Sequence, residues 1–383
     1  MTGSKRVVVF GTGFVGRMVI PEIVKHPLFE LVGVGVSNPD KVGRDVGDIC
    51  GMSEKVGVLA TDDVDALIAL KPDALVHYGP TAMHAKENIK LITAFLRAGI
   101  DVCSTAMTPW VWPTMHLNPP NWIEPITEAC ELGESSCFTT GIDPGFANDL
   151  FPMTLMGLCS EVRKVRASEL LDYTNYEGDY EFEMGIGREP EFKPMLEDRD
   201  MLIFAWGATV PMIAHAAGIM LDEITTTWDK WVTPTERARG VIKPDTSPFT
   251  INGVYKGRDP HPARARQPHR ARCRPDWPTG HDNDVYRVDI EGTPSIFQET
   301  AFRFTDGSGR DARPVPVDRA AGAERGAGRQ RSAARLGDPA GSSAYRRSRQ
   351  YTVTCAYTVP DSLYSSRIAS AEIGYRYNRQ NRG

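Results

Sequence analysis

Over the first 140 residues, short apolar runs alternate with stretches whose apolar positions recur every three or four residues. The runs are rich in β-branched residues, as is typical of strands buried on both faces of a parallel sheet. We expect such strands at Lys5–Phe10, Leu31–Val36, Val56–Ala60, Ala74–Tyr78, Asp101–Ser104 and Cys137–Thr140. Helices are expected at Val15–Lys25, Asp63–Leu70 (capped by Thr61 or Asp62), Ala82–Ala98 and Trp122–Leu132. This alternation predicts an α/β domain over residues 1–150, with a doubly wound parallel sheet.

After residue 150 the pattern changes to strands in which polar and apolar residues alternate, so that only one face is apolar. We expect these strands at Val165–Asp172, Glu223–Val232, Gly240–Ile242, Phe249–Tyr255, Val285–Glu291 and Ser295–Phe304. A helix over Leu202–Leu221 is interrupted by Gly207 and Pro211. Residues 151–307 are therefore predicted to form a second domain of the α+β class.

A glycine motif follows the first predicted strand directly. Its six residues, Gly11, Thr12, Gly13, Phe14, Val15 and Gly16, form a G-x-G-x-x-G sequence that opens a helix. In a Rossmann-type domain the first glycine permits a tight turn, the second admits a pyrophosphate, and the third lets helix and strand pack closely. The helix N-terminus also attracts phosphate. The motif therefore predicts a dinucleotide site, although an ordinary glycine-rich turn is the alternative.

The end of the second strand bears on the choice between NAD and NADP. An acidic residue there would bind the ribose 2′-hydroxyl and repel a 2′-phosphate. This chain has Ser37 and Asn38, which can donate to a phosphate, and then Lys41 and Arg44, which can supply positive charge. The pattern favours NADP, while Asp40 leaves NAD open. The alternative is that the two cations are solvated loop residues.

Ligands of doubly wound sheets bind at the carboxyl ends of the strands. Three segments of the chain follow such ends: Tyr78–Thr81, Ser104–Met107 and Gly141–Asp149. The first contributes Gly79 and Thr81 to the predicted cofactor site, and His77 and His84 flank it. Histidines in such places are more often structural than functional.

Several segments together resemble a known family. Val7–Arg17, Ser37–Asp45, Gly47–Met52, Gly141–Leu150 and Glu169–Tyr176 are similar to dihydrodipicolinate-reductase-like dehydrogenases, and most similar to the 2,4-diaminopentanoate dehydrogenase type. The resemblance implies an oxidoreductase that uses a nicotinamide cofactor and acts at a C–N or C=N bond. It also implies that the second domain binds substrate and a second copy of the chain. The paired histidines and lysine of dihydrodipicolinate reductases proper are missing, which argues against their specific reaction.

An amine substrate requires a carboxylate to hold its ammonium group and a base to accept a proton. Asp143, Glu169 and Tyr173 are the catalytic candidates, with hydrogen bonding between domains as the alternative role for the last two. The turn that contains Asp143 would otherwise be a plain domain crossing, with Asn148 or Asp149 as a helix cap.

Charge divides the chain into two unlike parts. Residues 1–257 contain all 12 lysines, 10 arginines and 35 acidic residues, a net −13, whereas residues 258–383 contain 22 arginines, 14 acidic residues and no lysine, a net +8. Arginine-rich sequence interrupts the second domain at residues 259–274 and dominates a tail over residues 308–383. Because Ala, Arg, Gly and Pro build no core, we expect the tail to be disordered.

Two explanations of these segments are open, a basic arm for nucleic acid and a reading-frame error in GC-rich DNA. A shift of one nucleotide turns both segments apolar, which favours the frame error. The protein as written would then lack one strand of its second sheet. The nucleotide sequence of the gene distinguishes the two explanations.

Other classes of protein are excluded by composition. The chain has no apolar run of about 18 residues and no signal peptide pattern, so we expect a cytoplasmic protein without membrane association. Its seven cysteines lack paired spacing, and none of its Cys and His spacings matches a metal site. We expect an NAD(P)-dependent oxidoreductase for a small amino-acid-like substrate, acting as a homo-oligomer with no nucleic-acid partner. The alternative is a non-catalytic nucleotide-binding protein, damaged or regulatory, with a basic interaction tail.

Overall fold

The computed structural model describes residues 4–79, 84–113, 118, 120–170, 191–219, 221–231, 245–254, 261–267, 285–302, 304–305 and 311–312 of the chain. The chain divides into two compact units, and the first boundary between them falls after Thr140. The sequence pattern predicted this boundary at residue 150. In the structure, the segment Gly141–Leu150 belongs to the second unit.

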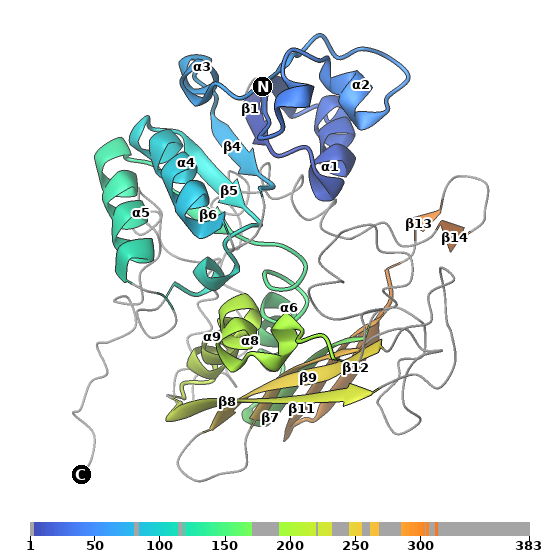
Figure 1. The fold of residues 1–383 in the computed structure, drawn as a ribbon. Helices are drawn as coiled ribbons and strands as arrows, with labels where there is room; N and C mark the ends of the chain where they lie inside the picture. Colours follow the sequence, from blue (N-terminus) through green and yellow to red (C-terminus); the bar gives the residue numbers. More distant parts are fainter. Residues whose placement is uncertain are drawn as a thin grey trace, which may run out of the picture. The chain divides into compact units, whose positions relative to one another are not determined.

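The first unit contains a six-stranded parallel sheet in the order β3-β2-β1-β4-β5-β6 (Figure 1). Its strands are β1 (Lys5–Phe10), β2 (Phe29–Gly35), β3 (Ala60–Thr61), β4 (Ala74–His77), β5 (Asp101–Ser104) and β6 (Cys137–Thr139). Its helices are α1 (Phe14–Lys25), α2 (Val46–Cys50), α3 (Val64–Ala69), α4 (Ala85–Arg97) and α5 (Pro120–Gly133), with short 3-10 turns η1 (Pro39–Lys41) and η3 (Thr108–Val111). This strand order is that of a Rossmann sheet, which confirms the predicted fold class.

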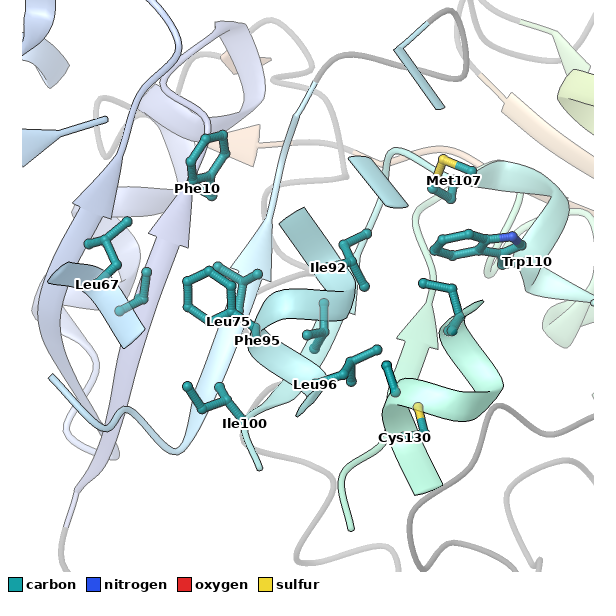
Figure 2. Close-up of a cluster of buried hydrophobic side chains, with 14 of the residues drawn as sticks. Phe10, Leu67, Leu75, Ile92, Phe95, Leu96, Ile100, Met107, Trp110 and Cys130 are labelled. Atoms are coloured by element: carbon teal, nitrogen blue, oxygen red, sulfur yellow. The ribbon is translucent and has the colours of Figure 1, made fainter. Parts of the chain in front are cut away.

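Two apolar cores lie on opposite faces of this sheet. Val7 and Val9 of β1 point into one core with α1 and α2, while Val8 and Phe10 point into the other. The second core joins α3, α4 and α5 to the sheet, and Figure 2 shows its largest side chains between them. Burial on both faces explains why the strands read as continuous apolar runs.

Two local predictions in the first unit were wrong. The expected strand Val56–Ala60 is reduced to β3, because the backbone N–H groups of Val56 and Gly57 donate to the Asp45 carboxylate at 3.0 and 2.8 Å. These hydrogen bonds hold the pKa of Asp45 below its ordinary value, and the bond from the Val56 N–H has the largest effect. Helix α3 is capped by Asp63, whose carboxylate accepts from the Ala66 N–H at 2.9 Å, rather than by Thr61 or Asp62.

The second unit contains a mixed six-stranded sheet in the order β12-β11-β7-β10-β9-β8 (Figure 1). Its strands are β7 (Glu161–Leu170), β8 (Glu223–Trp231), β9 (Asp245–Val254), β10 (His261–Gln267), β11 (Val285–Thr293) and β12 (Ile296–Thr300). Helices α6 (Leu150–Met156), α8 (Arg199–Trp206) and α9 (Thr209–Ala216) contact it, and η5 (Met195–Glu197) precedes α8. The predicted α+β class is confirmed, and the predicted helix break lies at Gly207, between α8 and α9. The expected strand Gly240–Ile242 lies outside the described residues.

The expectation that the second sheet lacks a strand was wrong. Residues His261–Gln267, inside the arginine-rich segment 259–274, form β10, which pairs in parallel with β7 and antiparallel with β9. Strand pairing uses backbone groups that an Ala- and Arg-rich segment possesses as fully as an apolar one. Pro262, which has no N–H to donate, lies at a shift in the register with β9.

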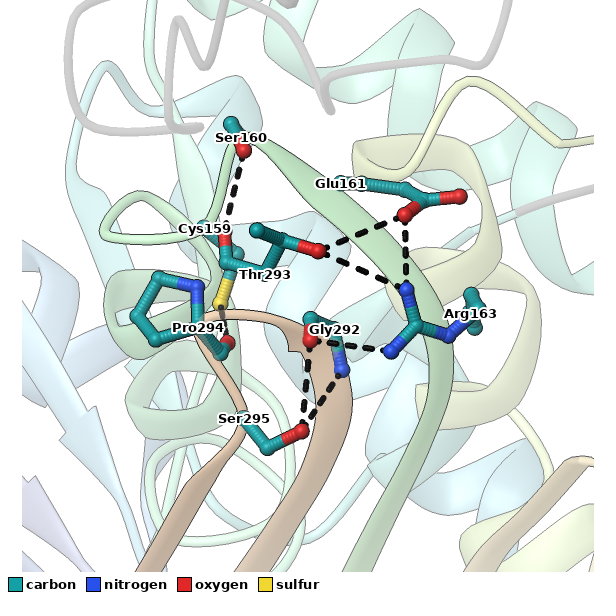
Figure 3. Close-up of polar contacts among 8 residues, drawn as sticks. All are labelled: Cys159, Ser160, Glu161, Arg163, Gly292, Thr293, Pro294 and Ser295. Atoms are coloured by element: carbon teal, nitrogen blue, oxygen red, sulfur yellow. Dashed lines mark hydrogen bonds and ion pairs between the residues drawn. The ribbon is translucent and has the colours of Figure 1, made fainter.

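A polar network ties the turn between β11 and β12 to the start of β7 (Figure 3). The Ser160 hydroxyl donates to the Thr293 carbonyl at 3.0 Å, and the Arg163 guanidinium donates to the Gly292 carbonyl at 2.9 Å. The Cys159 thiol donates to the Pro294 carbonyl at 3.1 Å, and burial raises its pKa. The network satisfies turn carbonyls and fixes the β11–β12 hairpin on the sheet.

Beyond the second sheet, the structure describes only a short pair, β13 (Phe304–Thr305) with β14 (Asp311–Ala312). The rest of the predicted tail, residues 308–310 and 313–383, lies outside the described residues. In the described part of the chain, no helix is both long and apolar enough to cross a membrane.

Candidate functional site

The turn between β1 and α1 is built on two glycines that the chain itself requires. Gly11 has a φ of +107°, and a Cβ there would lie 2.4 Å from the Tyr78 carbonyl oxygen. A Cβ on Gly16 would lie 1.9 Å from the carbonyl oxygen of Gly11. Any side chain at either position would collide with backbone, so these glycines hold the first turn of α1 against the sheet.

Gly13 differs from the other two glycines of the motif. Its φ of −72° suits any residue, and a Cβ there would meet no atom within 4 Å. It is also the N-cap of α1 and provides no side-chain cap to the helix. The fold alone therefore does not require a glycine at position 13. A ligand that approaches the backbone closely would require one, because a side chain would occupy its place. The turn fits a dinucleotide pyrophosphate, which Gly13, Phe14, Val15 and Gly16 would receive at the helix N-terminus.

Lys41 extends from the segment after β2 to this same turn. Its ammonium donates to the backbone carbonyl of Thr12 at 2.9 Å and contacts the Thr12 hydroxyl at 3.1 Å. Asn38 caps η1 by accepting from the Asp40 N–H at 2.9 Å, while Ser37 and Arg44 are exposed. Of the two predicted cations, Lys41 and Arg44, the structure thus brings Lys41 into contact with the glycine turn.

Arg17 is a further cation at this place that sequence reasoning missed. Burial raises the pKa of the Cys50 thiol to about 11. The positive charges of Arg17 and Lys41 oppose this shift, which means that both lie close enough to act on the thiol. Two positive charges therefore lie around the same thiol, beside the glycine turn. The position of Arg17 in the first turn of α1, one residue after the motif, was the available signal.

His77 ends β4 and is completely buried. Its Nδ1 lies 2.9 Å from the hydroxyl oxygen of Ser104, the last residue of β5. Burial lowers the pKa of His77 from 6.5 to about 4, so the ring is neutral at physiological pH. Gly79, a predicted cofactor residue, lies against this ring, since a Cβ on it would be 2.3 Å from His77 Nε2. Thr81 lies outside the described residues.

The catalytic candidates lie in the second unit. Asp143 is half-buried in the turn at its start and precedes Pro144 through a cis peptide bond. Asp149 closes this turn by accepting from the N–H groups of Gly145 and Leu150, each at 2.5 Å, and is the N-cap of α6. Glu169 is 1% exposed near the end of β7. Tyr173 lies outside the described residues, and the catalytic roles of all three candidates stay predictions.

Metal ligands do not gather in the described part of the chain, where no group of three or more His, Cys, Asp or Glu residues could hold an ion.

Comparison with known proteins assigns the family. Residues 5–108 match the model of the dihydrodipicolinate reductase N-terminal domain. An amine dehydrogenase of Streptomyces virginiae is 34% identical over 334 residues, which cover 82% of this chain and 90% of that protein. The chain belongs to the same family as this amine dehydrogenase.

The solved structure of an amine dehydrogenase from Mycobacterium smegmatis shares the fold. It superposes with a TM-score of 0.63 at 16% identity, covering 85% of this chain and 91% of that one. The glycine turn, the reductase-type N-terminal domain and the family together make this protein an NAD(P)-dependent oxidoreductase.

Substitution of Gly13 by alanine tests whether the glycine turn binds the pyrophosphate. We expect the dissociation constant for NADPH or NADH to rise at least about tenfold, because the new methyl group lies where the pyrophosphate approaches. The free energy of unfolding should change by less than about 1 kcal/mol, the effect of a poorer N-cap. Fluorescence titration and urea unfolding measure the two quantities. Gly16→Ala is the matched comparison and should lose the fold. Unchanged affinity in Gly13→Ala would refute the placement of the pyrophosphate.

The buried ring of His77 predicts a pH-dependent stability. Its folded pKa is about 4 and its unfolded value 6.5, so unfolding takes up a proton at pH values between them. The stability that the neutral ring confers is present above pH 6.5 and is lost as the pH falls toward 4. From pH 7 to pH 5 the loss should be roughly 2 kcal/mol. His77→Asn cannot titrate, so its difference from wild type in urea unfolding should change by this amount. A pH-independent difference would contradict the prediction.

Proposed function

We propose that the protein is an amine dehydrogenase that prefers NADP and transfers a hydride at the C–N or C=N bond of a small amino-acid-like substrate. The observation that carries this proposal is the 34% identity to an amine dehydrogenase over nine-tenths of that protein's length. The resemblance of Gly141–Leu150 and Glu169–Tyr176 to the 2,4-diaminopentanoate dehydrogenase type supports a substrate that carries both an amine and a carboxylate.

The residues divide the work between cofactor and substrate. A bound nicotinamide cofactor would supply the hydride acceptor for amine oxidation, or the hydride donor for the reverse reaction. Gly13, Phe14, Val15 and Gly16 of the glycine turn would hold the pyrophosphate of the cofactor at the N-terminus of α1. Asp143 or Glu169 holds the substrate ammonium group by charge, and Glu169 or Tyr173 accepts the proton that the nitrogen must lose before it forms a C=N bond.

Turnover with amines tests the proposal. We expect reduced nicotinamide to form when NADP is mixed with a small amine or diamino acid, and to be consumed when NADPH is mixed with the matching carbonyl compound and ammonia. Glu169→Gln should lower kcat about 100-fold or more while cofactor affinity stays unchanged, because the removal of a general base costs this much.

Glu197→Gln is the matched control and should keep full activity, because Glu197 is an exposed carboxylate of the same unit, at the end of η5. Cofactor binding without turnover on any amine would refute the proposed activity and favour the non-catalytic alternative.

The preference for NADP rests on Lys41 and Arg17, which place two positive charges beside the glycine turn. Lys41→Ala should weaken NADPH about tenfold and NADH much less, since only NADPH carries the 2′-phosphate. Lys25→Ala, which removes an exposed lysine from the opposite end of α1, is the control. The ratio of the two dissociation constants, from fluorescence titration, is the measured quantity. Equal losses for both nucleotides would mean that Lys41 supports the turn without selecting the phosphate.

A further inference from the structure

Three neighbouring strands of the first unit each end in a buried polar residue. His77 ends β4, Ser104 ends β5 and Thr139 ends β6, and their exposed fractions are 0, 0 and 6%. The pairing registers place His77 opposite Ser104 and Ser104 opposite Thr139. Because paired residues of parallel strands point to the same face, the three form a line across the sheet, here named the polar row.

The centre of the polar row has its hydrogen bonds satisfied. The Ser104 hydroxyl oxygen accepts from the Ala106 N–H at 3.1 Å and lies 2.9 Å from His77 Nδ1. Since this oxygen already accepts from Ala106, the arrangement favours a hydroxyl that donates to Nδ1, which leaves the ring proton on Nε2. The neighbours of the ring, Phe10, Gly79, Asn88 and Ser104, carry no charge.

The two ends of the polar row are different, because each presents a polar atom that makes no hydrogen bond within the described chain. These atoms are His77 Nε2 and the Thr139 hydroxyl oxygen, and both are buried. A buried polar atom without a partner is costly, so its presence in a native fold needs a reason. Shape alone does not supply one, since valine has the same branched shape as threonine and carries no hydroxyl.

The polar row also lies beside the dinucleotide turn. A Cβ on Gly11 would lie 3.2 Å from the Gly79 nitrogen, and Gly79 in turn lies against His77 Nε2. In the strand order, β2 and Lys41 lie on one side of β1, while β4, β5 and β6 lie on the other. A dinucleotide whose 2′-phosphate half lies toward Lys41 therefore extends its nicotinamide half along the ends of β4, β5 and β6.

We propose that the polar row is a binding element for the nicotinamide half of the cofactor, in which His77 Nε2 and the Thr139 hydroxyl bond the ribose hydroxyls or carboxamide of that half. Both atoms are covered in the protein alone, so the proposal requires that the strand ends open as the cofactor binds. Ser104 acts as a positioning residue, because it orients the ring and holds the backbone at Ala106. This proposal rests on the dinucleotide site, with the adenosine half of the cofactor toward Lys41, and is independent of the amine substrate.

Two variants remove the ends of the polar row while keeping its shape. Thr139→Val deletes the hydroxyl, and His77→Asn retains a group near Nδ1 while it deletes Nε2. Each should weaken NADPH about threefold to tenfold, the value of one hydrogen bond, and leave the affinity for 2′,5′-ADP unchanged, since that fragment lacks the nicotinamide half. His77→Gln, whose amide nitrogen reaches the place of Nε2, should recover part of the affinity. The measurement is calorimetric titration with both ligands.

Thr93→Val is the matched control, because Thr93 is equally buried at 6% and its hydroxyl donates within helix α4 to the Ile89 carbonyl. It should leave the affinities for both ligands unchanged. Unchanged NADPH affinity in Thr139→Val and His77→Asn would overturn the proposal, and so would an equal loss for both ligands. If Gly13→Ala also leaves NADPH affinity unchanged, the dinucleotide placement itself has failed, which separates that failure from a failure of the polar row.

Discussion

The backbone contact between the glycine turn and the end of β4 is the constraint on which the rest of the first unit depends. Gly11 approaches the Tyr78 carbonyl too closely for any side chain, and Gly16 approaches Gly11 in the same way. The Tyr78 N–H donates to the Phe10 carbonyl at 2.8 Å, so the contact continues the pairing of β1 with β4. The N-terminus of α1 is thereby fixed at the carboxyl edge of the sheet, with Gly13 uncovered. Lys41 reaches Thr12, and Gly79 meets His77, only because this turn is so close to the sheet.

The carboxyl edge carries different chemistry on its two sides. Toward β2, Lys41 and Arg17 provide positive charge beside the turn, which suits a phosphate. Toward β4 to β6, the edge has uncharged polar groups, and burial keeps His77 neutral. A nicotinamide ring alternates between a cationic and a neutral form, so a permanent charge beside it would favour one form over the other. With the nicotinamide half placed as proposed above, neutral partners on that side would hold the ring equally in both forms.

Much of this could be predicted from the sequence because it is local. Continuous apolar runs predicted the parallel strands, and glycine spacing predicted the turn, since both depend on neighbouring residues. The polar row could not be predicted, because it needs the register between strands that are distant in sequence. The strand expected at Val56–Ala60 failed because Asp45 captures its backbone N–H groups. Strand β10 was missed because pairing with β7 and β9 uses backbone atoms that the side-chain pattern of residues 261–267 does not reveal.

Glu169 is the more deeply buried of the two candidate carboxylates that the structure describes. Residues Ala167, Ser168, Glu169 and Leu170 are all buried, so both faces of β7 are covered at this end. Its register partner in β11 is Tyr286, which belongs to an apolar cluster with Ile142 and Ala147 of the turn that contains Asp143. A buried carboxylate is rarely unpaired in proteins, and the register partner of Glu169 in β10 is Arg266. The contact of Tyr286 with that turn also links the two candidate carboxylates through one packed cluster, within a single unit of the chain.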